Sequence, residues 1–293
     1  MVPVRYVAPY ILITAFQYFL GKDALAHTSP FVFGTMTTLL MTAALFTMSK
    51  GFKPILNRDT LLFSVFYWLS GASWLFGLNY ISPSQSAVIS FTMPLFAVPL
   101  SVWVLSERAP RIEILGAVIG FVGIILFNLP LLTGRATVLG VGLTLADAFF
   151  WALFSVYMRK LRTQDTPRTL ATASFFSFVL YGAFSMTDFS VLPSVNLAVD
   201  VTFLGLVSGA LNFYLWMALV KVEKVGKLTT MIFLAPVITL IYSVATTGVI
   251  PSYITLGGVG LIFLGIYAAN IIGSRGTQSA PVPTPTPIME HGS

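Results

Sequence analysis

Long apolar runs alternate with short polar links along almost the whole chain. Each run stays apolar for about 20 residues, which is typical of a membrane-spanning helix, whereas a transmembrane barrel strand alternates and is about half as long. The pattern therefore predicts an all-α integral membrane protein with ten transmembrane helices. We expect these helices at residues 4–26, 31–48, 60–81, 84–105, 112–132, 138–158, 168–186, 200–220, 227–248 and 253–272.

The basic residues are divided unevenly between alternate links. Only Lys22 and Arg135 fall on one side, which leaves 14 of the 16 Lys and Arg residues on the other side with both termini. Basic residues concentrate in cytoplasmic loops, so this division predicts that both termini are cytoplasmic. A missed or an extra span would scramble the division. We expect a multi-pass protein of the bacterial inner (plasma) membrane.

The composition excludes several classes of protein. Hydrophobic residues make up 56 % and charged residues 9 %, against about 45–50 % and about 25 % in soluble domains. The net charge of +6 is spread in small groups between apolar runs, so we expect no nucleic-acid partner. With no Cys and only His27 and His291, thiolate or His metal clusters are excluded. We find no P-loop, and we expect no enzyme activity and no cofactor.

The two halves of the chain repeat each other. The match is without gaps at a spacing of 142 residues, and it pairs Pro94, Gly116, Phe121 and Gly123 with Pro236, Gly258, Phe263 and Gly265. The repeat unit is five helices, an odd number, so the second copy is inverted in the membrane, as in many secondary transporters. Chance similarity among Gly-rich apolar helices is the alternative. We expect the repeats at 1–132 and 133–272, followed by a disordered cytoplasmic tail at 273–293, which is rich in Pro, Ser and Thr.

Pro94 and Pro236 are expected inside corresponding helices of the two repeats. A proline within a helix removes a backbone donor and leaves the carbonyl group four residues earlier without its partner. Paired interruptions of this kind are a pointer to a transport site, and we assign both prolines as helix breaks or hinges. A purely structural kink is the alternative, and the two roles are compatible.

Motifs in both halves resemble the drug/metabolite transporter superfamily, also called EamA-type transporters. They are Gly77-Leu78-Asn79-Tyr80, Met93-Pro94-Leu95-Phe96, Glu107, Gly116 through Gly123, Trp216-Met217-Ala218-Leu219 and Ala235-Pro236. Phe150-Trp151-Ala152 and the Trp216 segment are similar to the aromatic amino-acid exporter branch. The resemblance implies a ten-helix monomer with a central cavity between two five-helix halves. It also implies export of small metabolites by alternating access, without catalytic residues.

Polar side chains within a span are expected to face the bundle interior or water. Polar and small residues at helical spacing gather on helices one, three, four, six, eight and nine. Bonding of Ser and Thr to their own helix, and the enrichment of Trp at membrane interfaces, are the alternatives. The candidate substrate-binding residues are Gln17, Ser73, Trp74, Ser90, Met93, Asp147, Trp151, Asn212, Trp216 and Thr230. Helices five and ten carry small residues such as Gly116 and Gly120, which fit scaffold or oligomer contacts.

Asp147 is the only ionisable residue expected well inside a span. A charge near the membrane centre costs at least about 2.5–3.5 kcal/mol, so such a residue is a functional candidate. It could bind a substrate ammonium group or carry a proton. Alternatively, it could lie in a wet vestibule, or stay protonated and bond a neighbouring helix.

The favoured function is a secondary transporter that exports small amphipathic metabolites, chiefly aromatic and other large neutral amino acids. Export of other metabolites, drugs or nucleotide sugars, and a channel, remain alternatives. A phosphate-bearing substrate would require Lys or Arg in the lining, and none lies away from the helix ends. The partners expected are the small-molecule substrate and the lipid bilayer, and we expect a monomer.

Overall fold

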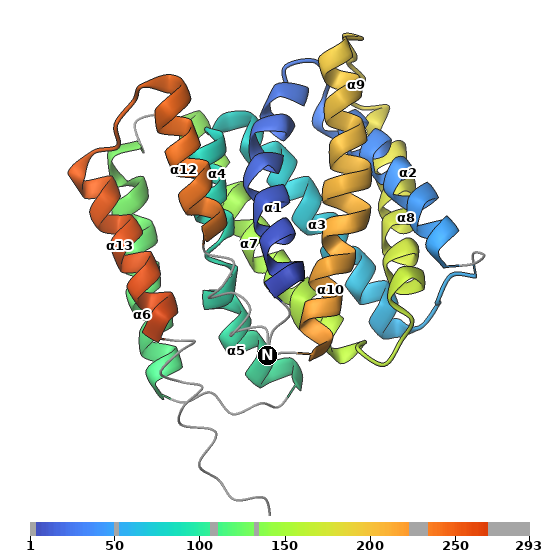
Figure 1. Ribbon diagram of the computed structural model, residues 1–293, viewed down its shortest axis with the longest axis horizontal. Coiled ribbons are helices and arrows are strands. Elements are labelled where there is room, and N and C mark those ends of the chain that lie inside the picture. The colour runs from blue at the N-terminus through green and yellow to red at the C-terminus, as the bar shows by residue number, and fades with distance from the viewer. Residues whose placement is uncertain (1–3, 50–52, 106–110, 132–134, 223–233, 269–293) are drawn as a thin grey trace, which may run out of the picture.

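The computed structural model describes residues 4–49, 53–105, 111–131, 135–222 and 234–268. In these residues the chain crosses the bundle ten times (Figure 1), which confirms the predicted ten-helix fold. The spans are α1 (Val4–Ala24), α2 (Pro30–Met48), α3 (Arg58–Tyr80), α4 (Pro83–Ser90) with α5 (Met93–Leu105), α6 (Arg111–Asn128), α7 (Arg135–Lys160), α8 (Thr166–Ser185), α9 (Val195–Thr202) with η2 (Phe203–Asn212) and α10 (Phe213–Val222), α12 (Leu234–Thr247) and α13 (Tyr253–Tyr267). A short 3-10 turn, η1 (Leu129–Leu131), follows α6. Within the described residues, five spans are each long and apolar enough to cross a membrane by themselves.

The fourth span is interrupted between α4 and α5. Helical structure stops at Ser90 and resumes at Met93, and the hydroxyl of Thr92 turns back to donate to the carbonyl oxygen of Ile89 at 2.6 Å. Pro94 therefore lies in the first turn of a new helix, where a missing N–H leaves no acceptor unpaired. Pro236 lies within α12, two residues after Leu234, the first described residue of that helix. The expectation of a proline inside one continuous helix is thus replaced, for Pro94, by two helices in line.

Helices α6 and α13 lie side by side at one edge of the bundle (Figure 1). Their glycines let the two backbones touch: a Cβ atom on Gly265 would lie 2.4 Å from the carbonyl oxygen of Gly116 and 2.4 Å from the amide nitrogen of Gly120. A Cβ atom on Gly258 would lie 2.3 Å from the amide nitrogen of Phe127. The small-residue faces of the fifth and tenth helices are therefore used for packing within the chain.

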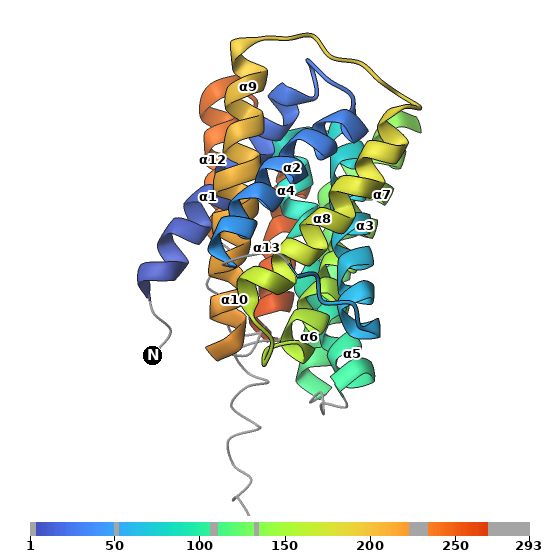
Figure 2. The same ribbon diagram turned by 90° about the vertical axis from the view of Figure 1, so that its right-hand side faces the viewer.

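At the end of the bundle away from the N-terminus, two links from different halves are tied together. The link 186–194 arches over the bundle (Figure 2) and meets the link 25–29. The amide of Leu192 donates to the carbonyl oxygen of His27 at 2.7 Å, and the hydroxyl of Thr28 donates to the carbonyl oxygen of Ser190 at 2.9 Å. These bonds join α1 and α2 to α8 and α9 at this end.

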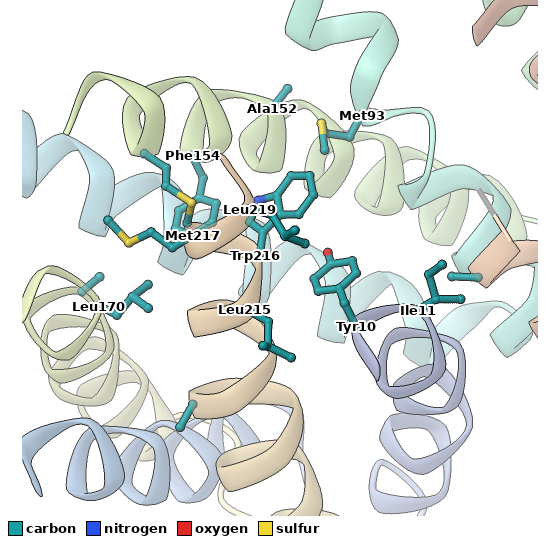
Figure 3. Packing of buried hydrophobic residues seen from close by; sticks show 14 of the residues in the cluster. Tyr10, Ile11, Met93, Ala152, Phe154, Leu170, Leu215, Trp216, Met217 and Leu219 are labelled. Atoms are coloured by element: carbon teal, nitrogen blue, oxygen red, sulfur yellow. The ribbon is translucent and has the colours of Figure 1, made fainter. Parts of the chain in front are cut away.

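Toward the other end, the bundle is filled by a cluster of apolar side chains (Figure 3). It draws on α1, α5, α7, α8 and α10, and it holds large, fully buried groups such as Met93, Phe154 and Trp216. In Figure 3, Tyr10 of α1 faces Trp216 of α10, with Met93 close to both. These buried side chains pack against one another along α1 and α10, so apolar groups fill the described part of the bundle there.

Candidate functional site

A cavity lies among α1, α2, α3, α7, α8 and the eighth span. Its volume is about 130 Å³, compared with about 10–15 Å³ for a cavity that holds one water molecule. The lining reaches from Asp147 and Trp151 near the middle of α7 to Phe33 at the start of α2 and Tyr181 near the end of α8. The cavity therefore occupies the middle of the bundle and the half that ends in the tied links.

Asp147 provides the carboxylate of this cavity, and it is only 4 % exposed. Its Oδ1 atom accepts a hydrogen bond from the hydroxyl of Ser70 at 2.7 Å, and its Oδ2 atom accepts one from the hydroxyl of Ser90 at 2.7 Å. The donors come from α3 and from the last residue of α4. One carboxylate of the second half is thus fixed by two helices of the first half, and the two bonds offset part of its desolvation.

Polar side chains of α1 and the eighth span also line the cavity. The hydroxyl of Ser208, in η2, donates to the Oε1 atom of Gln17. Both residues line the same cavity as Asp147. This bond joins α1 to the eighth span at the cavity wall, as the bonds of Asp147 join α7 to α3 and α4.

Aromatic rings form much of the remaining cavity wall. Trp74 meets Tyr18 edge to face, with ring centroids 5.8 Å apart, and Trp151 meets Phe91 in the same way at 5.9 Å. The indole nitrogens of both tryptophans are buried and have no hydrogen-bond partner in the described part of the chain. Among the residues that line the cavity, all of them described, none is Lys, Arg or His.

One wall residue, Tyr181 of α8, was not anticipated from the sequence. Its ring lies against α2, where a Cβ atom on Gly34 would be 2.6 Å from Cδ1 of Tyr181. Its hydroxyl lies against α3, where a Cβ atom on Gly71 would be 2.7 Å from the oxygen. In the sequence, the second and seventh spans (α2 and α8) show no polar stripe, so no lining role is predicted for them. The available signal was a glycine on each of two helices, which leaves space for one large side chain from a third helix.

The candidate residues divide into three groups. Four of them line the cavity: Gln17, Trp74, Asp147 and Trp151. Ser90 lies behind the lining as a donor to Asp147, and Ser73 is half-buried on α3 without lining the cavity. Met93, Asn212 and Trp216 are buried away from the cavity, and Thr230 lies outside the described residues, as do the side chains of Pro94 and Pro236.

Asn212 and Trp216 belong to a second, closed polar cluster between α1 and the eighth span. The Nδ2 atom of Asn212 donates to the hydroxyl oxygen of Thr14 at 2.9 Å. Trp216 is 1 % exposed and stacks on Tyr10 with ring centroids 5.3 Å apart and an interplanar angle of 25°. In the described part of the chain, Oδ1 of Asn212 and Nε1 of Trp216 have no hydrogen-bond partner.

Comparisons with known proteins agree with a transporter. The model of the EamA-like transporter family matches residues 7–129 and again residues 138–271, once in each half. An uncharacterized transporter in the sor 3′ region of Acidianus ambivalens is 38 % identical over 216 residues, which cover 74 % of this chain and 85 % of that protein. A probable amino-acid metabolite efflux pump of Salmonella typhimurium is 23 % identical over 291 residues, covering 93 % of this chain and 95 % of the pump.

A solved structure shares the fold. The crystal structure of a protein 20 % identical to this chain superposes with a TM-score of 0.72 and covers 92 % of this chain and 98 % of the other. At this identity the likeness concerns the fold alone. The family match in both halves and the ten-span bundle lead to one conclusion: the chain is a membrane transporter that belongs to the EamA-like transporter family of the drug/metabolite transporter superfamily.

Proposed function

We propose that this transporter exports amino acids with aromatic or other large apolar side chains. The observation that carries the proposal is the composition of the cavity, where one carboxylate, Asp147, stands among aromatic walls. A carboxylate held by two hydroxyl donors still has lone pairs for a third donor. The ammonium group of an amino acid would provide that donor and would also neutralise the buried charge.

The aromatic walls suit the rest of such a substrate. Trp74, Trp151 and Phe154 line the same cavity as Asp147. Two aromatic groups that stack or meet edge to face gain about 0.5–1.5 kcal/mol beyond area burial. The indole N–H groups of Trp74 and Trp151, which have no acceptor among the described residues, are the nearby donors for a substrate carboxylate. The name of the Salmonella relative, an amino-acid metabolite efflux pump, also supports this substrate class.

Other substrate classes fit the cavity to different degrees. A nucleotide sugar carries phosphates, which require Lys or Arg nearby, and the cavity lining contains neither. A hydrophobic amine without a carboxylate is the second candidate, because the lining holds an acid and no base. This second class includes cationic drugs, which use the same contacts to Asp147 and to the aromatic walls.

The proposal includes a topology with both termini in the cytoplasm, in a plasma membrane such as the bacterial inner membrane. Its support is the distribution of basic residues: Arg58, Arg111 and Arg159 stand at the end of the bundle where α1 begins. Lys22, one of the two exceptions, donates to the carbonyl oxygens of Leu78 and Asn79 at 2.8 and 2.9 Å, so it stabilises the end of α3.

The arrangement of the chain in the membrane completes the proposal. We assign the two repeats to residues 1–132 and 133–272 and a cytoplasmic tail to 273–293. The supporting observation is one family match in each half. The Gly-rich faces of α6 and α13 pack against each other within the chain, which favours a monomer. Pro94, in the first turn of α5, and Pro236, within α12, are proposed as hinges.

Counterflow in proteoliposomes tests the substrate class. Vesicles loaded with unlabelled phenylalanine should accumulate labelled phenylalanine, and external leucine or tryptophan should compete while a nucleotide sugar should not. Protein-free liposomes are the control. In vesicles loaded with phenethylamine, accumulation of labelled phenethylamine that external phenylalanine does not reduce would select the hydrophobic-amine alternative. A flux far above about a thousand molecules per second would indicate a channel, because gating motions occur on the millisecond scale.

A further inference from the structure

Two similar contacts hold the halves of this transporter together. In one contact α3 of the first half meets α7 of the second half, and in the other the eighth span meets α1. In the inverted repeat, α3 corresponds to the eighth span, and α7 corresponds to α1. The two contacts are therefore the same contact seen from opposite sides of the membrane.

Each contact has hydrogen bonds between side chains of its two helices, and in each a tryptophan lies one helical turn from a donor; the second contact also contains the Ser208–Gln17 bond. Ser70 donates to Asp147 across the first contact, and Asn212 donates to Thr14 across the second. Ser70 is followed four residues later by Trp74, and Asn212 is followed four residues later by Trp216. The likeness extends to the indole nitrogens, which are buried without a partner in the described residues of both contacts.

The surroundings of the two contacts differ. Ser70, Trp74 and Asp147 line the cavity. Thr14, Asn212 and Trp216 are 1 %, 4 % and 1 % exposed, and the apolar cluster of Figure 3 covers Trp216. The cavity thus reaches Ser70, Trp74 and Asp147 at the first contact. At the second contact it reaches Gln17 and Ser208 and leaves Thr14, Asn212 and Trp216 buried, and we call these three residues the sealed contact.

The sealed contact contains a group that fits a wet surface better than a core. The Oδ1 atom of Asn212 is buried, and no described residue donates to it. A buried amide oxygen without a donor costs free energy that water or a substrate would recover. Asn212 also ends η2, a segment with π-helical winding, which is frequent at functional sites and at places where a helix rearranges.

We propose that Thr14, Asn212 and Trp216 line the substrate path when the transporter is open to the opposite side, and that the Thr14–Asn212 bond closes the path in this structure. The proposal rests on the proposed function as an alternating-access transporter. In the opposite state, Asn212 Oδ1 would accept a hydrogen bond from the substrate's ammonium group, the role proposed above for Asp147 in the cavity. The indole N–H of Trp216 would face the same solute.

Single cysteines test the proposal without knowledge of the substrate, because the native chain has none. Ser70→Cys and Asn212→Cys are prepared in sealed vesicles of both orientations and exposed to a membrane-impermeant thiol reagent. We expect Ser70→Cys to react from one side and Asn212→Cys from the opposite side. Met217→Cys is the matched control, since Met217 lies on the same helix and is fully buried in the apolar cluster.

The labelling rates decide the outcome. Asn212→Cys should react at least about tenfold faster than Met217→Cys, because even a minor open state populated at a few per cent exposes it repeatedly. Equal rates for these two variants would overturn the proposal, and so would reaction of Asn212→Cys from the same side as Ser70→Cys. A negative counterflow assay with amino acids would reject the proposed substrate class and leave this labelling result unaffected.

A cross-link gives the functional test. Thr14→Cys with Asn212→Cys, bridged by a mercuric ion, should hold the sealed contact and lower counterflow about tenfold or more, as expected when the open state is removed from the population. A reducing thiol should restore counterflow. Counterflow that persists with the bridge formed would overturn the proposal. Size-exclusion profiles of the unbridged variant separate this effect from misfolding.

Discussion

Ser90, the last residue of α4, donates a hydrogen bond of 2.7 Å to Asp147. The helix ends directly after this donor, and helical structure resumes as α5 at Met93. The carboxylate of the cavity is therefore attached to the interruption of the fourth span. A substrate ammonium group that donates a hydrogen bond to Asp147 would shift the carboxylate and with it the Ser90–Asp147 bond. The geometry thus connects occupancy of the cavity to the part of the fourth span that lacks regular helical hydrogen bonds.

Asp147→Asn should keep the fold and weaken the binding of ammonium-bearing substrates. The amide retains one oxygen for Ser70, and the Ser90 hydroxyl can accept from the new NH₂ group. A hydrogen bond to a charged group contributes about 1.5–3 kcal/mol, so affinity should fall at least about tenfold. Binding by competition in counterflow measures the change. An unchanged affinity would assign Asp147 a structural role.

The same substitution should also flatten the pH profile. In the native protein, protonation of the Asp147 carboxylate would remove the charge that attracts an ammonium group, so apparent affinity should fall once the pH is low enough to protonate it. Asparagine cannot titrate, so the variant should show no such fall. Transport like the native protein's at every pH would mean that Asp147 carries no proton or substrate charge and that the protein works as a passive uniporter.

Trp151→Ala should impair aromatic amino acids more than small ones. Trp151 lines the cavity beside Asp147, and loss of ring contacts removes about 0.5–1.5 kcal/mol for an aromatic substrate only. Phenylalanine counterflow should therefore fall further than alanine counterflow. Trp103→Ala is the control, because Trp103 is 79 % exposed on α5. Equal losses for both substrates would indicate a folding defect.

Gly34→Ala should destabilise the cavity wall. The added Cβ atom would lie 2.6 Å from the Tyr181 ring, which is itself confined by Gly71, so the ring or α2 must shift. Overpacking of this kind costs about 1–3 kcal/mol, and we expect a lower unfolding temperature in detergent together with altered counterflow. Gly182→Ala on α8 is the matched control, since its nearest contact would be an ordinary 3.9 Å from Thr35. The same shift for both alanines would contradict the assignment.

Gly265→Ala should separate α6 from α13. Its Cβ atom would lie 2.4 Å from backbone atoms of Gly116 and Gly120, which cannot rotate away as a side chain can. We expect a large loss of thermal stability and of monodisperse protein. Gly260→Ala, on the same helix with nothing within 4 Å, should be neutral or slightly stabilising, because alanine favours helix over glycine by about 1 kcal/mol.

Topology can be tested with Val195→Cys and Leu56→Cys, at positions that are 80 % and 74 % exposed. They lie at opposite ends of the bundle, at the start of α9 and between α2 and α3. An impermeant thiol reagent added to intact cells should label Val195→Cys and should reach Leu56→Cys only after lysis. The reverse pattern would place the termini outside the cell.

The sequence alone determined the number and type of the spans. A bilayer core of about 30 Å requires about 20 apolar residues for each helix, so the apolar runs can be counted directly. The repeat and the place of Asp147 within a span could also be predicted, because both depend only on the order of residues along the chain. The sequence placed Pro94 inside the fourth span and suggested a helix break or hinge there, but it did not show that helical structure would end at Ser90 and resume at Met93.

Only the tertiary structure decided which polar faces meet the cavity. Gln17 and Asn212 both stand on polar stripes at helical spacing, yet Gln17 lines the cavity and Asn212 is sealed against Thr14. Helical periodicity tells which residues share a face, and it does not tell which neighbouring helix covers that face. Tyr181 makes the same point, since its place in the wall depends on glycines of two other helices, Gly34 and Gly71, far from it in the sequence.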